Sequence, residues 1–300
     1  MTTRTTDAAT RRPVAGGSVT EAGSRWLWLS IPLAALGAVA AAAGILFEST
    51  YERDTENFAT QAIAQDYITL FVAVPALLVL RQLAARGSLP ARLFWHGAVF
   101  YFAYTYTIAA FMVRFNGLFL VYTSIVACSL YALLGSVGGI QCRADRRWFD
   151  AARWPRRGVA VLLLVIVAMF STMWLSDIVP ALIEGVVPES LAEADTPTNG
   201  IEVIDLSLLL PGAALLAYWV LRSEPRGYVL ATGLLSYLAL LALALVAMAI
   251  GQYNADLADN PAPAALFAVL ALVVVGFLTR IAEATGPNEA SRRDQPRKVT

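Results

Sequence analysis

Two aspartates, Asp66 and Asp205, interrupt stretches of this 300-residue chain that are otherwise apolar. Between Asp66 and Arg81 lie 14 uncharged residues, roughly 21 Å of helix, so Asp66 is expected inside a membrane-spanning segment. An ionised carboxylate is costly there unless it is paired or faces water. Gln61 and Gln65 precede it with the four-residue spacing of one helix face, so these polar side chains should face the interior of a helix bundle. Such a group could bind a polar ligand or carry a proton.

The expected counter-charge for Asp66 is Arg114, which stands in a tight hairpin together with Asn116. Tyr104 and Asp205 are expected at similar depths in the membrane. One interpretation is a small polar pocket, open to the exterior, in which the arginine binds an anionic group or the aspartate carries a proton. The other is a buried ion pair that orients two helices. The predicted ligand-binding residues are Asp66, Arg114, Gln65, Asn116, Asp205 and Tyr104.

Other chemistries lack the residues that they need. The sequence contains no recognised catalytic, metal-binding or nucleotide-binding motif. His96 is the single histidine, which argues against a haem held by two histidines and against a histidine-rich metal centre. Cys128 and Cys142 are 14 residues apart along one predicted helix and its exit, roughly 21 Å, which is beyond disulfide reach. The sequence therefore predicts no enzyme activity, no cofactor and no metal.

The elements that position these residues are predicted to be eight transmembrane helices, which gives an all-α, polytopic membrane helix bundle. Hydrophobic residues make up 58% of the chain, and the mean hydropathy is +0.62. A helix needs about 20 mainly apolar residues to cross about 30 Å of hydrocarbon. Runs of about that length cover 26–47, 58–80, 93–113, 117–140, 158–178, 203–221, 227–250 and 262–280, and two of them, 58–80 and 203–221, reach spanning length only if an aspartate is tolerated.

The basic residues predict the orientation of the bundle. With the N-terminus inside, 20 of the 22 Lys and Arg residues fall on the cytoplasmic side, and only Arg53 and Arg114 fall outside. The positive-inside rule then places both termini in the cytoplasm. The membrane is expected to be the plasma membrane. Residues 1–24 and 284–300 are predicted to be disordered cytoplasmic tails on either side of a transmembrane domain, residues 25–283.

The same charges bear on the partners of the protein. Because the basic residues are dispersed over five inner segments, nucleic-acid binding is not expected. The expected partner is the lipid bilayer. The inner loop 141–157 resembles an amphipathic segment whose aromatic residues, including Trp148 and Trp154, insert into the membrane while its arginines meet anionic lipid. Docking of a cytoplasmic protein is the alternative for this loop.

A spacing near 140 residues suggests an internal repeat. Two sets of four residues recur at offsets of 139 to 141: Asp66, Arg81, Arg86 and Gly87, then Asp205, Arg222, Arg226 and Gly227. Four helices return the chain to its starting side, so a duplication would relate two four-helix halves by an axis along the membrane normal, a parallel repeat. Pro75 and Pro211 are out of register in this alignment, and chance matches between apolar helices are the alternative.

The chain resembles an uncharacterised prokaryotic family of multi-pass membrane proteins in three segments, QDYITLFVAVPALLVLRQLAARGS, YFAYTYTIAAFMVRFNGLFLVY and DLSLLLPGAALL. The resemblance covers about half of the chain. It implies a shared architecture that includes Gln65 and Asp66, and it implies no activity, cofactor or catalytic residue. Two hypotheses stay open: a transporter or binding protein for an unknown small molecule or ion, and a structural or accessory membrane subunit without transport or catalysis.

Overall fold

The computed structural model of the protein describes residues 25–141 and 153–285. Within this range every regular element is a helix, which confirms the predicted all-α class. The predicted tail 1–24 lies outside the described residues, as do most of the tail 284–300 and most of the loop 141–157.

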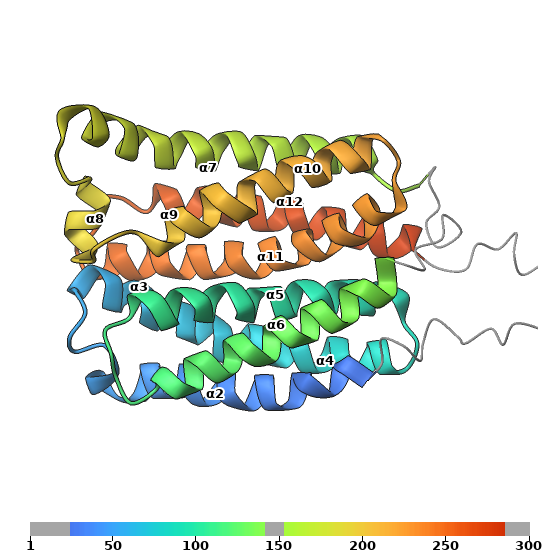
Figure 1. The fold of residues 1–300 in the computed structure, drawn as a ribbon, viewed down its shortest axis with the longest axis horizontal. Helices are drawn as coiled ribbons and strands as arrows, with labels where there is room; N and C mark the ends of the chain where they lie inside the picture. The colour runs from blue at the N-terminus through green and yellow to red at the C-terminus, as the bar shows by residue number, and fades with distance from the viewer. Residues whose placement is uncertain (1–24, 142–152, 286–300) are drawn as a thin grey trace, which may run out of the picture.

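The helices lie side by side in one elongated bundle (Figure 1). In chain order they are η1 (Arg25–Leu29), α2 (Ser30–Leu46), η2 (Glu48–Thr50), α3 (Glu56–Ile68), η3 (Thr69–Ala73), α4 (Val74–Ala85), α5 (Leu89–Met112), α6 (Phe119–Gln141), α7 (Arg156–Glu184), α8 (Glu189–Ala194), α9 (Gly200–Ile204), η5 (Asp205–Leu209), α10 (Leu210–Leu221), α11 (Pro225–Asn254) and α12 (Ala262–Ala284).

Seven helical stretches in the described part of the chain are long and apolar enough to cross a membrane. They are Arg25–Leu46, Glu56–Ala85, Phe119–Ser136, Arg156–Glu184, Gly200–Leu221, Pro225–Asn254 and Ala262–Ala284. These stretches match seven of the eight predicted spans, and several continue past the apolar run because a helix need not end where the hydrocarbon ends. The remaining predicted span, 93–113, corresponds to α5, a 24-residue helix whose arginine, histidine and tyrosines lower its hydropathy.

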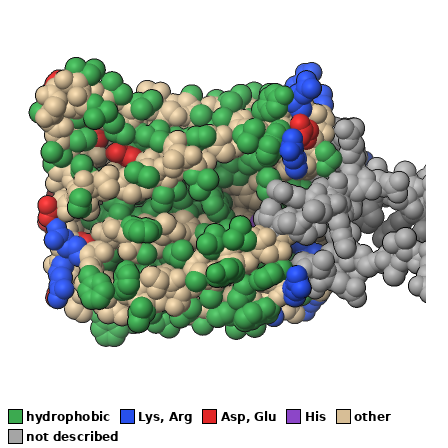
Figure 2. All heavy atoms as spheres, in the orientation of Figure 1, with side chains coloured by type: hydrophobic (Ala, Val, Ile, Leu, Met, Phe, Trp, Pro, Cys, Tyr) green, Lys and Arg blue, Asp and Glu red, His purple; other side chains and the backbone are tan. Residues whose placement is uncertain are grey.

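The connections between the long helices gather at two ends of the bundle (Figure 1). Segments 47–55, 113–118, 185–199 and 255–261 lie at one end, which we call the α8 end. Segments 86–88, 153–155 and 222–224, with both ends of the described chain, lie at the opposite end. Arg53 and Arg114 are the described arginines at the α8 end, and the other described arginines lie toward the opposite end. Figure 2 shows basic side chains at the ends of the bundle and hydrophobic side chains along its flank.

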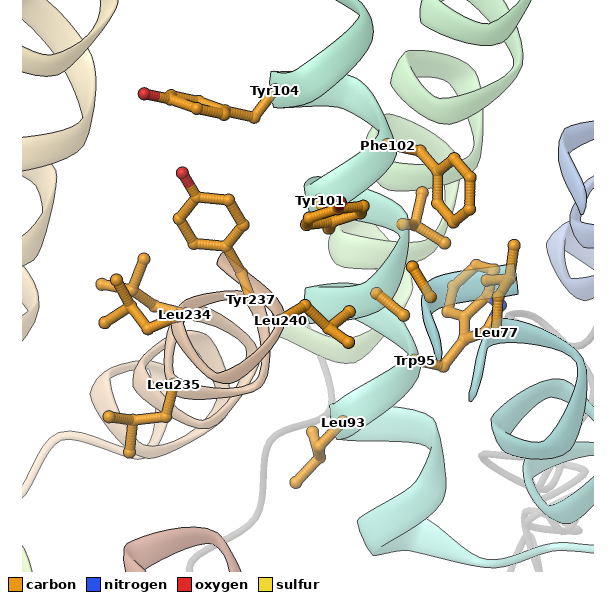
Figure 3. Packing of buried hydrophobic residues seen from close by; sticks show 14 of the residues in the cluster. Leu77, Leu93, Trp95, Tyr101, Phe102, Tyr104, Leu234, Leu235, Tyr237 and Leu240 are labelled. Carbon is orange, nitrogen blue, oxygen red and sulfur yellow. The ribbon is translucent and has the colours of Figure 1, made fainter. Parts of the chain in front are cut away.

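Helices α5 and α11 form the centre of the bundle and approach each other closely at Gly97 and Gly233. A Cβ atom on Gly97 would overlap the carbonyl oxygen of Gly233 and would lie 2.6 Å from the backbone nitrogen of Tyr237. Small residues permit such close contact between membrane helices. The two helices carry large buried side chains (Figure 3), among them Trp95, Tyr101, Phe102 and Tyr237.

Two of the spans contain a five-residue π-helical segment, η3 in the first half of the chain and η5 in the second. Each precedes a helix with proline in its first turn, Pro75 and Pro211. Proline lacks an N–H group and its ring clashes with the carbonyl group four residues earlier, which favours a local change in helical pitch. From 69 to 205 and from 75 to 211 the separation is the same, 136 residues, so these landmarks align Asp205 with Thr69 and not with Asp66.

One described residue of the loop 141–157 contradicts its predicted role. Trp154 is 3% exposed, and its ring centroid lies 4.5 Å from that of Tyr228. It therefore packs against the bundle, and the prediction that it inserts into lipid is wrong. Binding of anionic lipid by the rest of the loop, including Trp148, concerns residues outside the described range and stays a prediction.

Candidate functional site

A cavity of about 340 Å³ lies near the α8 end, between the first half of the chain, which ends with α6, and the second half, which begins with α7. Its wall includes residues of α3, α5, α6, α7, η5 and α11. Four of the six predicted ligand-binding residues line this cavity: Gln65, Asp66, Tyr104 and Asp205. The structure thus brings together two aspartates that are far apart in the sequence.

Asp66 occupies the last turn of α3, directly before the π-helical segment η3. Its side chain is buried, and its Oδ2 atom accepts a 2.7 Å hydrogen bond from the hydroxyl group of Tyr51. A Cβ atom on Gly44 of α2 would overlap the same carboxylate, so this glycine makes room for it. Burial, and then the charge of Asp66, raise the pKa of Tyr51 well above 10, so the phenol keeps its proton and remains a donor.

Asp205 is the first residue of η5, and it too is buried. Its Oδ1 atom accepts a hydrogen bond of 2.8 Å from the hydroxyl group of Tyr104 on α5. Its Oδ2 atom accepts one of 3.0 Å from the indole nitrogen of Trp174 on α7. Tyr104 belongs to the first half of the chain and Trp174 to the second, so this carboxylate links the two halves.

The polar face of α3 also borders the cavity, as the four-residue spacing predicts. The amide nitrogen of Gln65 donates a 2.9 Å hydrogen bond to Thr105 of α5. Asn57 accepts hydrogen bonds from Gln61, at 2.8 Å, and from Gln252 of α11, at 2.7 Å. These bonds tie α3 to both central helices and hold amide groups at the cavity wall.

The wall of the cavity is acidic and partly apolar. Among the described residues that line it, none is Lys, Arg or His, whereas two are the carboxylates Asp66 and Asp205. Phe170, Met173 and Met248 contribute apolar surface. The described residues contain no group of three or more His, Cys, Asp or Glu side chains that could hold a metal ion.

Two buried tyrosines outside the cavity lining, Tyr101 and Tyr237, pack next to groups of the site. Tyr101 is fully buried and shares a 2.9 Å hydrogen bond with Thr69, the first residue of η3. Tyr237 is also fully buried and packs edge-on against Tyr104, with 5.4 Å between ring centroids (Figure 3). Each tyrosine therefore contacts either Thr69, at the start of η3, or Tyr104, which binds Asp205.

Arg114 and Asn116 lie elsewhere, so the predicted ion pair between Asp66 and Arg114 is wrong. The guanidinium group of Arg114 pairs with Asp195, and its backbone N–H donates to Asp54 Oδ1 at 3.0 Å. Asn116 donates to the carbonyl oxygen of Thr50 at 3.0 Å. Arg114 and Asn116 border a separate hollow of about 250 Å³ at the α8 end. The segment 185–199 supplies the acid that pairs with the arginine, and no residue spacing predicts the conformation of this loop.

Sequence reasoning also missed Tyr51 and Trp174, the two donors that come from outside α3 and α5. A single aromatic residue in a loop or a span carries no periodic signal, so neither could have been found from spacing. The histidine has a local role: His96 Nδ1 lies 2.7 Å from the backbone carbonyl of Arg92, one turn earlier in α5.

Comparison with known proteins adds no assignment to this site. No family model matches the chain, and neither a curated protein nor a solved structure matches it. The class of the protein therefore follows from its helices alone: with seven helices long and apolar enough to span a bilayer in the described part, it is a multi-pass membrane protein. The bilayer is its environment.

Proposed function

We propose that this protein is a non-enzymatic protein of a prokaryotic plasma membrane that binds, and carries across the membrane, a small solute held in the cavity between its two halves. The observation that carries the proposal is the pair of buried carboxylates, Asp66 and Asp205, which reach one cavity from opposite halves of the chain. Ionisable residues inside membrane spans are costly and typically mark substrate or ion pathways. Many carriers bind their substrates at the interface of two such halves.

In this proposal α5 is the eighth transmembrane span, and both termini are cytoplasmic. Its 24 residues correspond to roughly 36 Å of helix, which exceeds the thickness of the hydrocarbon core. It packs along α11, α6 and α4, which themselves are parts of candidate spans. The arginines gathered at the end opposite α8 support a cytoplasmic location for that end under the positive-inside rule. The cavity would then lie near the outer face.

The proposal includes a duplication of four helices. Its support is one separation, 136 residues, that relates η3 to η5, Pro75 to Pro211 and Gly97 to Gly233. Arg86 and Arg222, at the ends of α4 and α10, keep the same separation and nearly the same backbone angles, φ −81° and −76°. An axis between Gly97 and Gly233, parallel to the helices, would relate the halves. Two such halves could rock about their shared crossing to move a solute.

One observation favours the second candidate, a structural or accessory subunit. Both carboxylates already accept hydrogen bonds from protein donors, as residues that only orient helices would. In a scaffold the space between the halves would exclude water, whereas a binding site needs it to be open. Whether water and small reagents can enter the cavity therefore distinguishes a carrier from a scaffold.

The experiment uses single cysteines in an otherwise cysteine-free variant and a small thiol reagent that does not cross membranes. Met248 on α11 lines the cavity, whereas Ile250, two residues nearer the α8 end, is 45% exposed on the flank. On intact cells Met248→Cys should react, and Ile250→Cys should not, because lipid covers it. Ser88→Cys, at the opposite end, should react only after the membrane is opened. Failure of Met248→Cys to react would favour the scaffold, and outside labelling of Ser88→Cys would contradict the proposed orientation.

A further inference from the structure

We infer that the cavity selects an organic cation, such as a protonated amine with an apolar or aromatic body, which Asp66 and Asp205 hold by its charge. This inference rests on the proposed function, because it names the class of solute that the same cavity would take. It follows from the charges, the shape and the chemistry of the cavity wall.

The described side chains that line the cavity include acids but no bases. Two carboxylates line the cavity, and no Lys, Arg or His stands among its described lining residues. Charges in a site of low dielectric interact strongly, so two uncompensated carboxylates would repel an anion and attract a cation. The one arginine that the sequence suggested as a partner, Arg114, is paired with Asp195 outside the cavity. A cationic solute would supply the missing counter-charge.

The carboxylate oxygens of Asp66 and Asp205 can accept more hydrogen bonds than the protein gives them. An ionised carboxylate offers about four acceptor positions. Asp66 receives one hydrogen bond, from Tyr51, and Asp205 receives two, from Tyr104 and Trp174. Tyr122 also lines the cavity, and its buried hydroxyl group has no hydrogen-bond partner in the described part of the chain. Acceptors therefore remain for the N–H groups of an ammonium ion.

The size and lining of the cavity favour an organic cation over a metal ion. The cavity of about 340 Å³ is at the small end of the range for organic ligands, roughly 300–1,000 Å³, and far larger than a bare ion needs. Within the described residues no cluster of three metal-ligating side chains occurs. Besides amide and hydroxyl groups, the wall carries apolar and aromatic side chains, among them Phe170 and Trp174 on α7. Aromatic faces attract organic cations and cover the apolar body of an amine.

The test begins with two thiol reagents of similar size and opposite charge, a trimethylammonium-ethyl and a sulfonatoethyl methanethiosulfonate. They are applied to Met248→Cys in the purified full-length protein, and each rate is divided by the rate for a free thiol. The normalised rate of the cationic reagent should exceed that of the anionic one by at least about tenfold. The ratio should fall markedly in Asp66→Asn and further when Asp205→Asn is added. If Asp205→Asn does not fold, the ratio in Asp66→Asn alone decides.

The second arm identifies the class of ligand by protection of the same cysteine. Phenethylammonium should slow labelling at concentrations where 3-phenylpropanol and 3-phenylpropanoate do not. A rate ratio near one, a faster anionic reagent, or equal protection by the neutral alcohol would overturn the inference while leaving an open cavity in place. No protection by phenethylammonium would overturn it as well. If neither reagent reaches Met248→Cys, the proposed function itself fails.

Discussion

The two spans that contain a π-helical segment, α3–η3–α4 and α9–η5–α10, have the same order of helical elements. They differ in where the carboxylate stands and in which side chains donate hydrogen bonds to it. In the first, the π-helical segment begins with Thr69, and the carboxylate lies three residues earlier, at Asp66. In the second, the segment begins with the carboxylate itself, Asp205. Asp66 is held by Tyr51, from its own half, whereas Asp205 is held by donors from both halves.

This difference indicates that the two carboxylates have different roles in the cavity. Asp205 joins Tyr104 of α5 to Trp174 of α7, so it contributes to the docking of the two halves. Asp66 has a single protein donor and borders the polar face of α3, so it has more capacity left for a ligand. Asp205 is therefore expected to matter more for stability, and Asp66 more for binding.

The largest effect is expected at the close crossing of α5 and α11. Gly97→Ala would bring a methyl group against the backbone of α11, which cannot move aside as a side chain can, and should cost roughly 1–3 kcal/mol. Gly233→Ala is the matched control. The nearest atom to its new methyl group, the Cβ of His96, lies at an ordinary 3.6 Å, so this change should be nearly neutral or slightly stabilising. Equal thermal midpoints of the two variants would contradict the described crossing.

The next prediction compares the two aspartates directly. Asp205→Asn offers one carbonyl oxygen to two donors, so either Tyr104 or Trp174 would face an NH₂ group, at a cost of roughly 1–3 kcal/mol. In Asp66→Asn the remaining oxygen can still accept from Tyr51, so its cost should be clearly smaller. Unfolding in a denaturing-detergent titration measures both. A larger loss for Asp66→Asn than for Asp205→Asn would reverse the assignment of roles.

A smaller effect, the coupling energy between Asp66 and Arg114, is expected for the pair that the sequence suggested. Because Asp66 bonds to Tyr51 and Arg114 to Asp195, the free energies of unfolding lost in Asp66→Asn and Arg114→Gln should add to within about 0.5 kcal/mol in the double variant. The measurement is a double-mutant cycle. A coupling above about 1 kcal/mol would show that these two side chains interact after all.

The smallest prediction concerns pH at the α8 end. Burial raises the pKa of the Asp54 carboxyl group above 3.8, although the N–H and charge of Arg114 partly oppose this. Protonation is therefore easier in the folded state, and the stability it provides is full in acid and lost as pH rises through the raised pKa. Asp54→Asn stays neutral, so its thermal midpoint should be slightly higher than that of the wild type at neutral pH, with the gap closing near pH 3.8. A more stable wild type at neutral pH would mean that the charge of Arg114 outweighs burial.

The sequence was sufficient to predict seven of the spans because crossing a bilayer requires about 20 apolar residues in a row, a condition that depends on local composition. The polar stripe of α3 was predictable for a similar reason, since Gln61 and Gln65 repeat with the helical period. The positions of the π-helical segments could not be predicted. Pro75 and Pro211 indicate a disturbed helix, but only the backbone shows that η3 and η5 precede these prolines.

Partners from irregular segments could not be predicted. The conformations of the segments 47–55 and 185–199 depend on the helices against which they pack, and these segments supply Tyr51 and Asp195. Similar expected depths in the membrane suggested a pair of Asp66 and Arg114. In the structure the loops supply a different partner for each, Tyr51 for Asp66 and Asp195 for Arg114. Apolar periodicity predicts which face of a span is buried, but it does not predict which side chain of another element will meet that face.

The central claim, a hydrated binding cavity shared by the two halves, is tested most directly by an electron cryo-microscopy structure of the protein in lipid nanodiscs. We expect density for water or a bound solute between Asp66 and Asp205, with α3 on one side of it and η5 on the other. A structure in which Asp66 faces lipid, or in which the side chains around both carboxylates close into dry packing, would contradict it.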